Sequence, residues 1–133
     1  MASKPAWIHI TGVPGVLNYD HVLSPAVRLG DVLYLSGQTP RDASGEVIQG
    51  DIEQMTERRQ CIRNLELVIK HAGGSLKDVV KMTVFLKNMD DFPRVNAVFE
   101  RIIPSPKPAR SCIQVARNPA DVPVEIEAIA RAP

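Results

Sequence analysis

The fold is decided by one segment, residues 51–74, which reads DIEQMTERRQCIRNLELVIKHAGG. Its apolar residues recur at steps of three and four, as they do on one face of a helix. The members of this stripe are Ile52, Met55, Ile62, Leu65, Ile69 and Ala72. Asp51 and Gln54 have the spacing of a capping box, and Gly73 and Gly74 end the pattern. The segment therefore predicts a single helix of roughly 20 residues, long enough to cover one face of a four-stranded sheet.

Strands are predicted on both sides of this helix, wherever apolar and polar residues alternate. The stretches are 7–11, 26–29, 32–36, 79–86, 111–115 and 124–130. A second amphipathic helix follows Asp90 as its cap and is ended by Pro104 and Pro106. Two helices that both return to one sheet predict a two-layer α+β sandwich, with a mixed sheet and both helices on one face.

The other face of the sheet carries a mixture of charged and apolar side chains that is too apolar in parts to be left to water. Its members are Lys81, Thr83, Phe85, Glu125, Glu127 and Ile129. Symmetric homo-oligomers are the common way to cover such a face. We therefore expect this face to be buried against other copies of the chain.

Length and composition narrow the class of protein. The 133 residues fit one domain, residues 1–133, and the formal charge is +1. The chain shows no basic stripe with interleaved aromatic residues, so we expect no nucleic-acid partner. It has no apolar run near 18 residues and no signal-peptide core, so no membrane span and a cytoplasmic location are expected.

The sequence also lacks the usual signatures of metal and cofactor sites. The three histidines, at His9, His21 and His71, lie at no metal-ligand spacing. No glycine-rich phosphate loop is present. We expect neither a metal nor a cofactor.

The strongest chemical signal is the stretch Pro108-Ala109-Arg110-Ser111-Cys112. An arginine at the mouth of a strand can hold a small carboxylate by two parallel hydrogen bonds, although a surface salt bridge is the alternative. Cys112 shares the strand face of Arg110 and would be a nucleophile only beside a base. The sequence suggests no such base, which favours a packed or pocket-lining thiol.

Two further places have both a functional and a structural interpretation. Gly37 follows the Ser36 hydroxyl at a strand end, where it either faces a ligand or merely ends the strand. Glu125 and Glu127 share one face of the last strand. They could work as an acid–base pair or serve as salt-bridge partners in an interface.

Five segments together resemble the RidA/YjgF family of reactive-intermediate deaminases. The resemblance runs in order and with family spacing from about residue 26 to residue 130. The segments are Leu35-Ser36-Gly37-Gln38, Val79 to Val84, Asp91-Phe92 with Val95-Asn96, Pro108 to Cys112, and Glu125-Ile126-Glu127-Ala128. The resemblance implies a chorismate-mutase-like α+β fold and a homotrimer with active sites in clefts between subunits. It also implies cofactor-free hydrolysis of 2-imino and 2-enamino acids to 2-keto acids and ammonia.

The resemblance assigns roles residue by residue. Arg110 matches the arginine that pairs with the substrate carboxylate, and Glu125 matches the glutamate near the hydrolytic water. The matching pocket positions that bind substrate are Ser36, Gly37, Asn96 and Cys112. An imine is already electrophilic, so such a site needs an anchor for a small anion and a group that steers water and moves a proton.

Two positions depart from the family pattern, and both change the pocket wall. Leu23 stands where the family usually has a tyrosine, with Tyr19 four residues earlier, and Lys107 replaces a bulky apolar residue. These departures keep two alternatives open. One is a pathway-specific relative acting on another enamine or a conjugated dicarboxylic acid, with Lys107 favouring a second negative charge. The other is a non-catalytic trimer that binds small carboxylates or other proteins.

Overall fold

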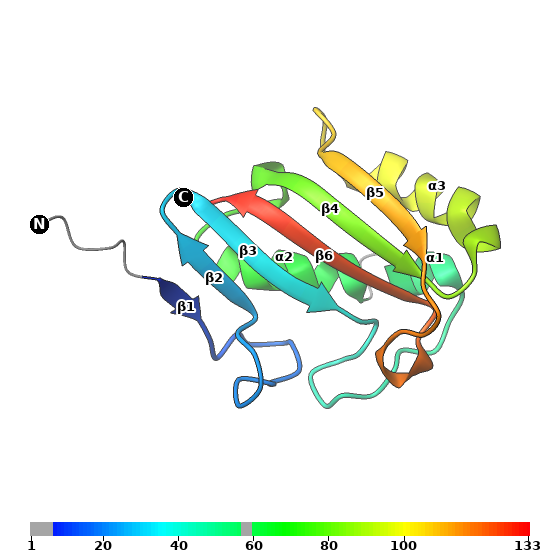
Figure 1. The fold of residues 1–133 in the computed structure, drawn as a ribbon, viewed down its shortest axis with the longest axis horizontal. Helices are drawn as coiled ribbons and strands as arrows, with labels where there is room; N and C mark the ends of the chain where they lie inside the picture. Colours follow the sequence, from blue (N-terminus) through cyan, green and yellow to red (C-terminus); the bar gives the residue numbers. More distant parts are fainter. Residues whose placement is uncertain (1–6, 57–59) are drawn as a thin grey trace, which may run out of the picture.

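The alternating stretches form one six-stranded mixed sheet, in the order β1-β2-β3-β6-β4-β5 (Figure 1). The computed structural model describes residues 7–56 and 60–133. The strands are β1 Ile8–Ile10, β2 Ala26–Leu29, β3 Val32–Gln38, β4 Val79–Leu86, β5 Ala109–Gln114 and β6 Val124–Arg131. The helices are α1 Ile52–Thr56, α2 Cys61–His71 and α3 Phe92–Ile102, with short 3-10 turns at Leu76–Asp78, Met89–Asp91 and Pro119–Asp121.

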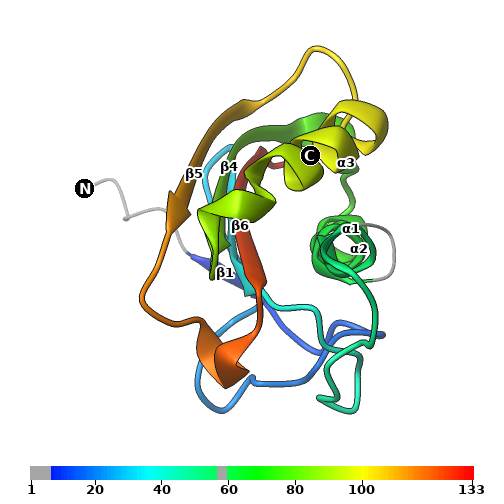
Figure 2. The ribbon, with the colours of Figure 1, turned by 90° about the vertical axis from the view of Figure 1, so that its right-hand side faces the viewer.

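The two layers are plain when the sheet is seen on edge, because all three helices lie on one side of it (Figure 2). β4 and β5 run parallel, joined by the crossover through α3, and every other neighbouring pair is antiparallel. β6 lies between β3 and β4 although it is last in the chain. The predicted two-layer α+β sandwich, with both helical segments on one face, is confirmed.

The core lies between the helices and the sheet. Leu65, Val68 and Ile69 of α2 are fully buried, and so are Met82 of β4 and Ile126 of β6. These side chains come from the apolar stripe of the helix and from alternate positions of the strands, as the two periodicities require. The same alternation sends Glu125 and Phe85 to the opposite, open face, where the two residues are paired across β4 and β6.

The predicted single helix over residues 51–72 is wrong. α1 ends at Thr56 and α2 begins at Cys61, and Gln60 between them has φ −151° and ψ −76°, which is not helical. Residues 57–59 lie outside the described part of the chain. The side-chain amide of Gln60 donates to the Arg41 carbonyl and to Asn64 Oδ1, so the break lets a buried amide reach the loop after β3.

The ends of this helical segment are as predicted. Asp51 and Gln54 form the capping box, with the Gln54 amide donating to Asp51 Oδ1 at 2.9 Å and the Asp51 amide donating to Gln54 Oε1 at 3.1 Å. At the other end Gly73 has φ +92°, a conformation that favours glycine. The Gly74 amide then donates to the Ile69 carbonyl at 2.9 Å, which completes a Schellman cap.

The predicted Asp90 cap is wrong. A 3-10 turn, Met89–Asp91, precedes α3, and its cap is Asn88, whose side chain accepts from the Asp90 amide at 2.9 Å. Four strands also differ in their bounds. β1 covers 8–10 rather than 7–11, β3 continues two residues beyond Ser36, β5 covers 109–114 rather than 111–115, and β6 ends one residue later than predicted, at 131.

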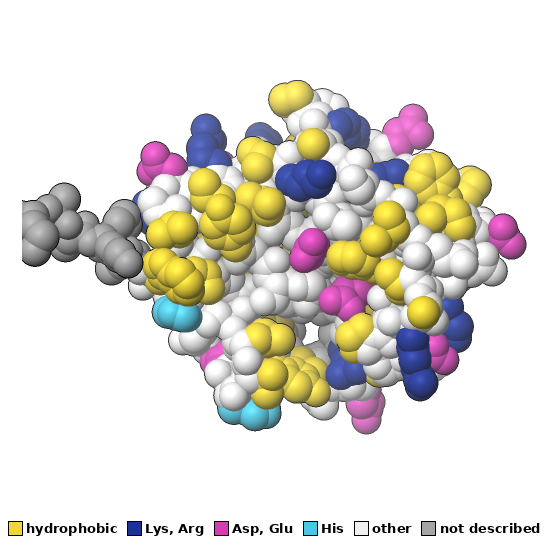
Figure 3. Space-filling view, in the orientation of Figure 1, with side chains coloured by type: hydrophobic (Ala, Val, Ile, Leu, Met, Phe, Trp, Pro, Cys, Tyr) yellow, Lys and Arg dark blue, Asp and Glu magenta, His cyan; other side chains and the backbone are white. Residues whose placement is uncertain are grey.

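The open face of the sheet carries apolar side chains beside charged ones (Figure 3). Tyr34 and Ile113, on strands at opposite sides of this face, have exposed fractions of 46% and 45%. Among the helices of the described residues, none is both long enough and apolar enough to cross a membrane.

Candidate active site

Arg110 lies on the helix side of the sheet, at its edge. It is paired with the buried Met82 of β4, so its side chain points toward α3. Its Nη2 donates to Asn96 Oδ1 at 2.5 Å, and its guanidinium lies over the rings of Phe99, at 4.7 Å, and Phe92, at 5.5 Å. Within the described residues no carboxylate pairs with Arg110. The structure thus brings two predicted site residues together and leaves the arginine able to bind an anion.

A cavity of about 230 Å³ lies beside this arginine. It is lined by Asn96, Phe99, Glu100, Ile103, Lys107, Pro108 and Arg110. The Lys107 ammonium donates to the Phe99 and Glu100 carbonyls, each at 3.0 Å, and to the Ile103 carbonyl. Lys107 therefore stabilises the C-terminal end of α3, where a cation complements the helix dipole. Because Lys107 already binds these carbonyls, its presence does not require a second negative charge on the substrate.

The two thiols are unsuited to nucleophilic attack. Cys112 is half-buried against the core, and burial raises the pKa of its thiol, opposed in part by the charge of Arg110. Complete burial raises the pKa of Cys61 well above its ordinary value, and its Sγ lies 3.8 Å from the Val124 carbonyl oxygen. Since the thiolate is the reactive form, the Cys112 thiol is better suited to packing against the core than to nucleophilic attack, and Cys112 lines neither the cavity beside Arg110 nor the one at Glu125.

Glu125 and Gly37 meet at a second cavity, of about 170 Å³, on the open side of the sheet. A Cβ atom added at Gly37 would lie 2.1 Å from Glu125 Oε1, so only glycine leaves the carboxylate its place. The lining residues are Leu17, Tyr19, Leu23, Gly37, Gln38, Thr39, Arg41, Asn64, Pro119 and Glu125. Figure 3 shows this hollow on the open face, near the tip of β3.

The Glu125 carboxyl has a pKa raised above its ordinary value. Burial is the main cause and the charge of Glu127 adds to it, whereas the charge of Arg41 opposes it. A carboxyl whose pKa moves toward neutral exchanges its proton more readily during a reaction near neutral pH. Glu125 is therefore the group of this cavity best suited to acid–base work.

Ser36 holds the loop that contributes Leu23 to the lining of this cavity. Its hydroxyl donates to the Ser24 carbonyl at 2.7 Å and its amide donates to the Pro25 carbonyl at 2.9 Å. These bonds fix the loop that carries Leu23. Tyr19 lines the same cavity as Leu23, so a phenol is present in the wall although Leu23 occupies the position of the family's tyrosine.

The predicted site residues fall into two groups on opposite faces of the sheet. Arg110, Asn96 and Cys112 lie on the helix side, whereas Ser36, Gly37 and Glu125 lie on the open side. Arg110 is level with Met82, and Glu125 is level with Phe85 on the intervening strand. Within one chain the anchor and the carboxylate do not share a pocket.

Sequence reasoning missed Arg41 in the second cavity. A signal was present in Gln60 and Asn64, which are polar residues among the apolar positions of the helical segment. Both are buried, with exposed fractions of 4% and 2%, and they donate hydrogen bonds to the carbonyls of the loop after β3. Buried polar side chains are costly unless they are hydrogen-bonded, so such residues mark a loop that is held in place.

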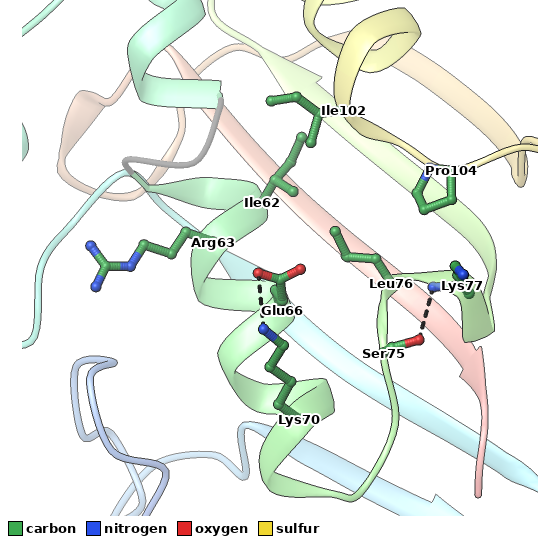
Figure 4. A pocket seen from close by; sticks show the side chains of 9 residues that line it. All are labelled: Ile62, Arg63, Glu66, Lys70, Ser75, Leu76, Lys77, Ile102 and Pro104. Atoms are coloured by element: carbon green, nitrogen blue, oxygen red, sulfur yellow. Dashed lines mark hydrogen bonds and ion pairs between the residues drawn. The ribbon is translucent and has the colours of Figure 1, made fainter.

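A larger hollow, of about 570 Å³, lies on the helix side of the sheet, between α2 and α3 (Figure 4). Ile62, Leu76 and Ile102 line it together with an ion pair between Lys70 and Glu66 at 3.5 Å. It contains none of the predicted site residues. Across residues 7–56 and 60–133, no group of three or more His, Cys, Asp or Glu side chains could hold a metal ion.

Comparisons with known proteins cover most of the chain. A family model described as endoribonuclease L-PSP matches residues 18–132. A RutC family protein of Pyrococcus horikoshii is 44% identical over 108 residues, which cover 80% of this chain and 84% of that protein. The 2-iminobutanoate/2-iminopropanoate deaminase of Salmonella typhimurium is 41% identical over 107 residues, covering 78% of this chain and 82% of that enzyme. The crystal structure of the yjgF gene product of E. coli has a TM-score of 0.84 at 35% identity, with 95% of this chain and 99% of that one covered.

Proposed function

The chain belongs to the endoribonuclease L-PSP family, the RidA/YjgF family indicated by its motifs, and from this premise we propose that it hydrolyses 2-imino and 2-enamino acids to 2-keto acids and ammonia. The observation that carries the proposal is Arg110, whose guanidinium is positioned by Asn96 and is not paired with any carboxylate of the described residues. The similar Salmonella protein is named for the deamination of two small 2-imino acids.

The reaction can be written with these residues. Arg110 binds the substrate carboxylate and orients C2 of the imine. Glu125 takes a proton from water as the water oxygen bonds to C2 of the protonated imine and the C=N electron pair moves to nitrogen, which gives a neutral carbinolamine. The same carboxyl then returns this proton to nitrogen, the C–N bond breaks as the hydroxyl becomes a carbonyl, and the hydroxyl proton passes through Glu125 to the departing ammonia, so the products are a 2-keto acid and ammonium. The reaction is redox-neutral, so it needs no electron acceptor.

A complete site in this scheme needs a second copy of the chain. Arg110 and Glu125 lie on opposite faces of one sheet, so a neighbouring copy has to bring its Glu125 to the edge strand β5 that carries Arg110. The exposed Ile113 on β5 and Tyr34 on β3 offer apolar surface for that contact. We therefore propose a homotrimer with its active sites between subunits, in agreement with the family resemblance.

The direct test is to generate 2-iminopropanoate enzymatically and to measure the release of pyruvate. We expect acceleration by the wild type and a loss of roughly 10²-fold in kcat/KM for Arg110→Ala, which removes a bidentate charged contact. Glu125→Gln should lower kcat, while KM changes less. Arg63→Gln, at an exposed position on α2 that lines neither of the two cavities, is the matched control and should equal the wild type.

Two results would overturn this function. One is a wild-type protein that does not accelerate imine hydrolysis, and the other is an undiminished rate in Arg110→Ala. Binding of pyruvate that depends on Arg110, without any turnover of imines, would instead support a carboxylate-binding module.

A further inference from the structure

Arg41 gives the second cavity a cation that the hydrolytic scheme does not use. It lies in the loop after β3, three residues beyond Gln38, and it lines the same cavity of about 170 Å³ as Glu125. No ion pair within 4.0 Å joins these two residues, although Arg41 is near enough to lower the pKa of Glu125. A guanidinium and a carboxylate that face one small cavity without touching leave space for a ligand between them.

The backbone of Arg41 is held by two buried side chains. Asn64 Nδ2 donates to the Arg41 carbonyl at 2.9 Å and to the Thr39 carbonyl at 3.2 Å. The Gln60 amide donates to the same Arg41 carbonyl and to Asn64 Oδ1, the latter at 3.0 Å. Two buried side-chain amides thus hold this loop in place. The Arg41 side chain therefore extends from a fixed backbone and is pre-organised for binding.

One nitrogen of the Arg41 guanidinium is not satisfied by the protein. Nε of Arg41 is buried and has no hydrogen-bond partner among residues 7–56 and 60–133. A buried N–H donor costs free energy unless it has a hydrogen-bond acceptor, and a charged donor costs more than a neutral one. Arginine also matches a carboxylate better than any other side chain, because two of its N–H groups can bind both oxygens.

We infer that Arg41 binds a second carboxylate, at the far end of the substrate side chain, so that the substrates are 2-imino or 2-enamino dicarboxylic acids. This inference rests on the proposed function. Arg110 of one subunit would hold the first carboxylate, and Arg41 would hold the second beside Glu125 of the other subunit. The small volume of the cavity suits a short side chain, such as those derived from acidic amino acids.

The test compares two imines, 2-iminosuccinate and 2-iminopropanoate, generated by amino acid oxidases from aspartate and alanine. We expect the wild type to favour the dicarboxylate in kcat/KM. Arg41→Gln should lower the ratio of the two values by about 10-fold or more, which is the scale of a charged hydrogen bond. The ratio for Arg41→Lys should lie between the ratios of the wild type and of Arg41→Gln. Arg63→Gln should keep the wild-type ratio. A ratio unchanged in Arg41→Gln overturns the inference.

Calorimetric binding of two keto acids separates this inference from the proposed function. If the wild type hydrolyses neither imine, the proposed function fails, and binding of 2-oxoglutarate and 2-oxobutanoate then decides the role of Arg41. If Arg41→Gln weakens the binding of 2-oxoglutarate and leaves that of 2-oxobutanoate unchanged, Arg41 forms a subsite for a second carboxylate. Equal weakening of both, or no binding of either to the wild type, overturns it.

Discussion

Gly37 and Glu125 show how one residue without a side chain fixes the place of another. The glycine is required by the carboxylate, because a Cβ atom would lie 2.1 Å from Glu125 Oε1. This requirement does not come from backbone conformation, which any residue could adopt at Gly37. The same carboxylate is tuned by its surroundings, since burial and Glu127 raise its pKa and Arg41 lowers it.

We predict that Gly37→Ala displaces the Glu125 carboxylate and leaves the fold intact, because the atom that has to move is the end of a flexible side chain. A misplacement of about 1 Å at a reacting group can cost roughly 10²-fold in rate. The measurements are kcat for 2-iminopropanoate and the midpoint of thermal unfolding.

The matched control for this prediction is Gly74→Ala. There a Cβ atom would approach Asp78 Oδ2, at 3.0 Å, and Ile69 Cγ2, at 3.1 Å, and neither residue lines either of the two cavities. A Gly37→Ala variant that keeps the wild-type kcat would show that Glu125 tolerates the shift.

At the scale of elements, residues at the ends of the helices hold the segments that carry Arg41 and Arg110. At the break, the side-chain amide of Gln60 donates to the Arg41 carbonyl and so joins the helical segment to the loop that carries Arg41. At the other helix, Lys107 donates to three carbonyls at the C-terminal end of α3. Lys107 therefore joins α3, which carries Asn96, to the start of β5, which carries Arg110.

We predict that Lys107→Met lowers the midpoint of thermal unfolding by about 2–5 °C, because the carbonyls of the last turn of α3 lose their cation. Methionine keeps the length and apolar character of the side chain. Thermal unfolding followed by circular dichroism measures the change. Lys77→Met, at an exposed lysine in the 3-10 turn Leu76–Asp78, should unfold at the wild-type temperature. Equal midpoints for Lys107→Met and the wild type would count against the cap.

For the whole molecule, the separation of Arg110 and Glu125 on two faces predicts complementation between inactive variants. Arg110→Ala and Glu125→Gln should each be nearly inactive alone. Unfolded together in equal amounts and refolded, they should regain about a quarter of the wild-type rate, since a site between two subunits then contains both intact residues by random assembly.

The control for complementation is each variant refolded by itself at the same total concentration. A mixture as inactive as its parents would place both residues of a working site in one chain. Sedimentation of the mixed sample gives the number of subunits, and a monomer would contradict the proposed homotrimer.

Local pattern alone determined the layers and the core and pointed to Arg110, whereas Asn96 became a candidate only through the family resemblance. Alternation placed Met82 inside and Glu125 outside, and the capping box of Asp51 and Gln54 began the helical segment where predicted. These features follow from interactions between residues close in sequence and from the period of each element. The motif around Arg110 likewise made this arginine the candidate anchor, because its guanidinium can bind both oxygens of a carboxylate.

Only the tertiary structure decided which of these residues meet. Pairing of β6 with β4 put Glu125 on the face opposite Arg110, and the fold brought Arg41 from the loop after β3 to the same cavity as Glu125. The break at Gln60 likewise depends on a carbonyl 19 residues earlier in the chain. Such contacts join segments far apart in sequence, and no local periodicity carries the distance or direction between them.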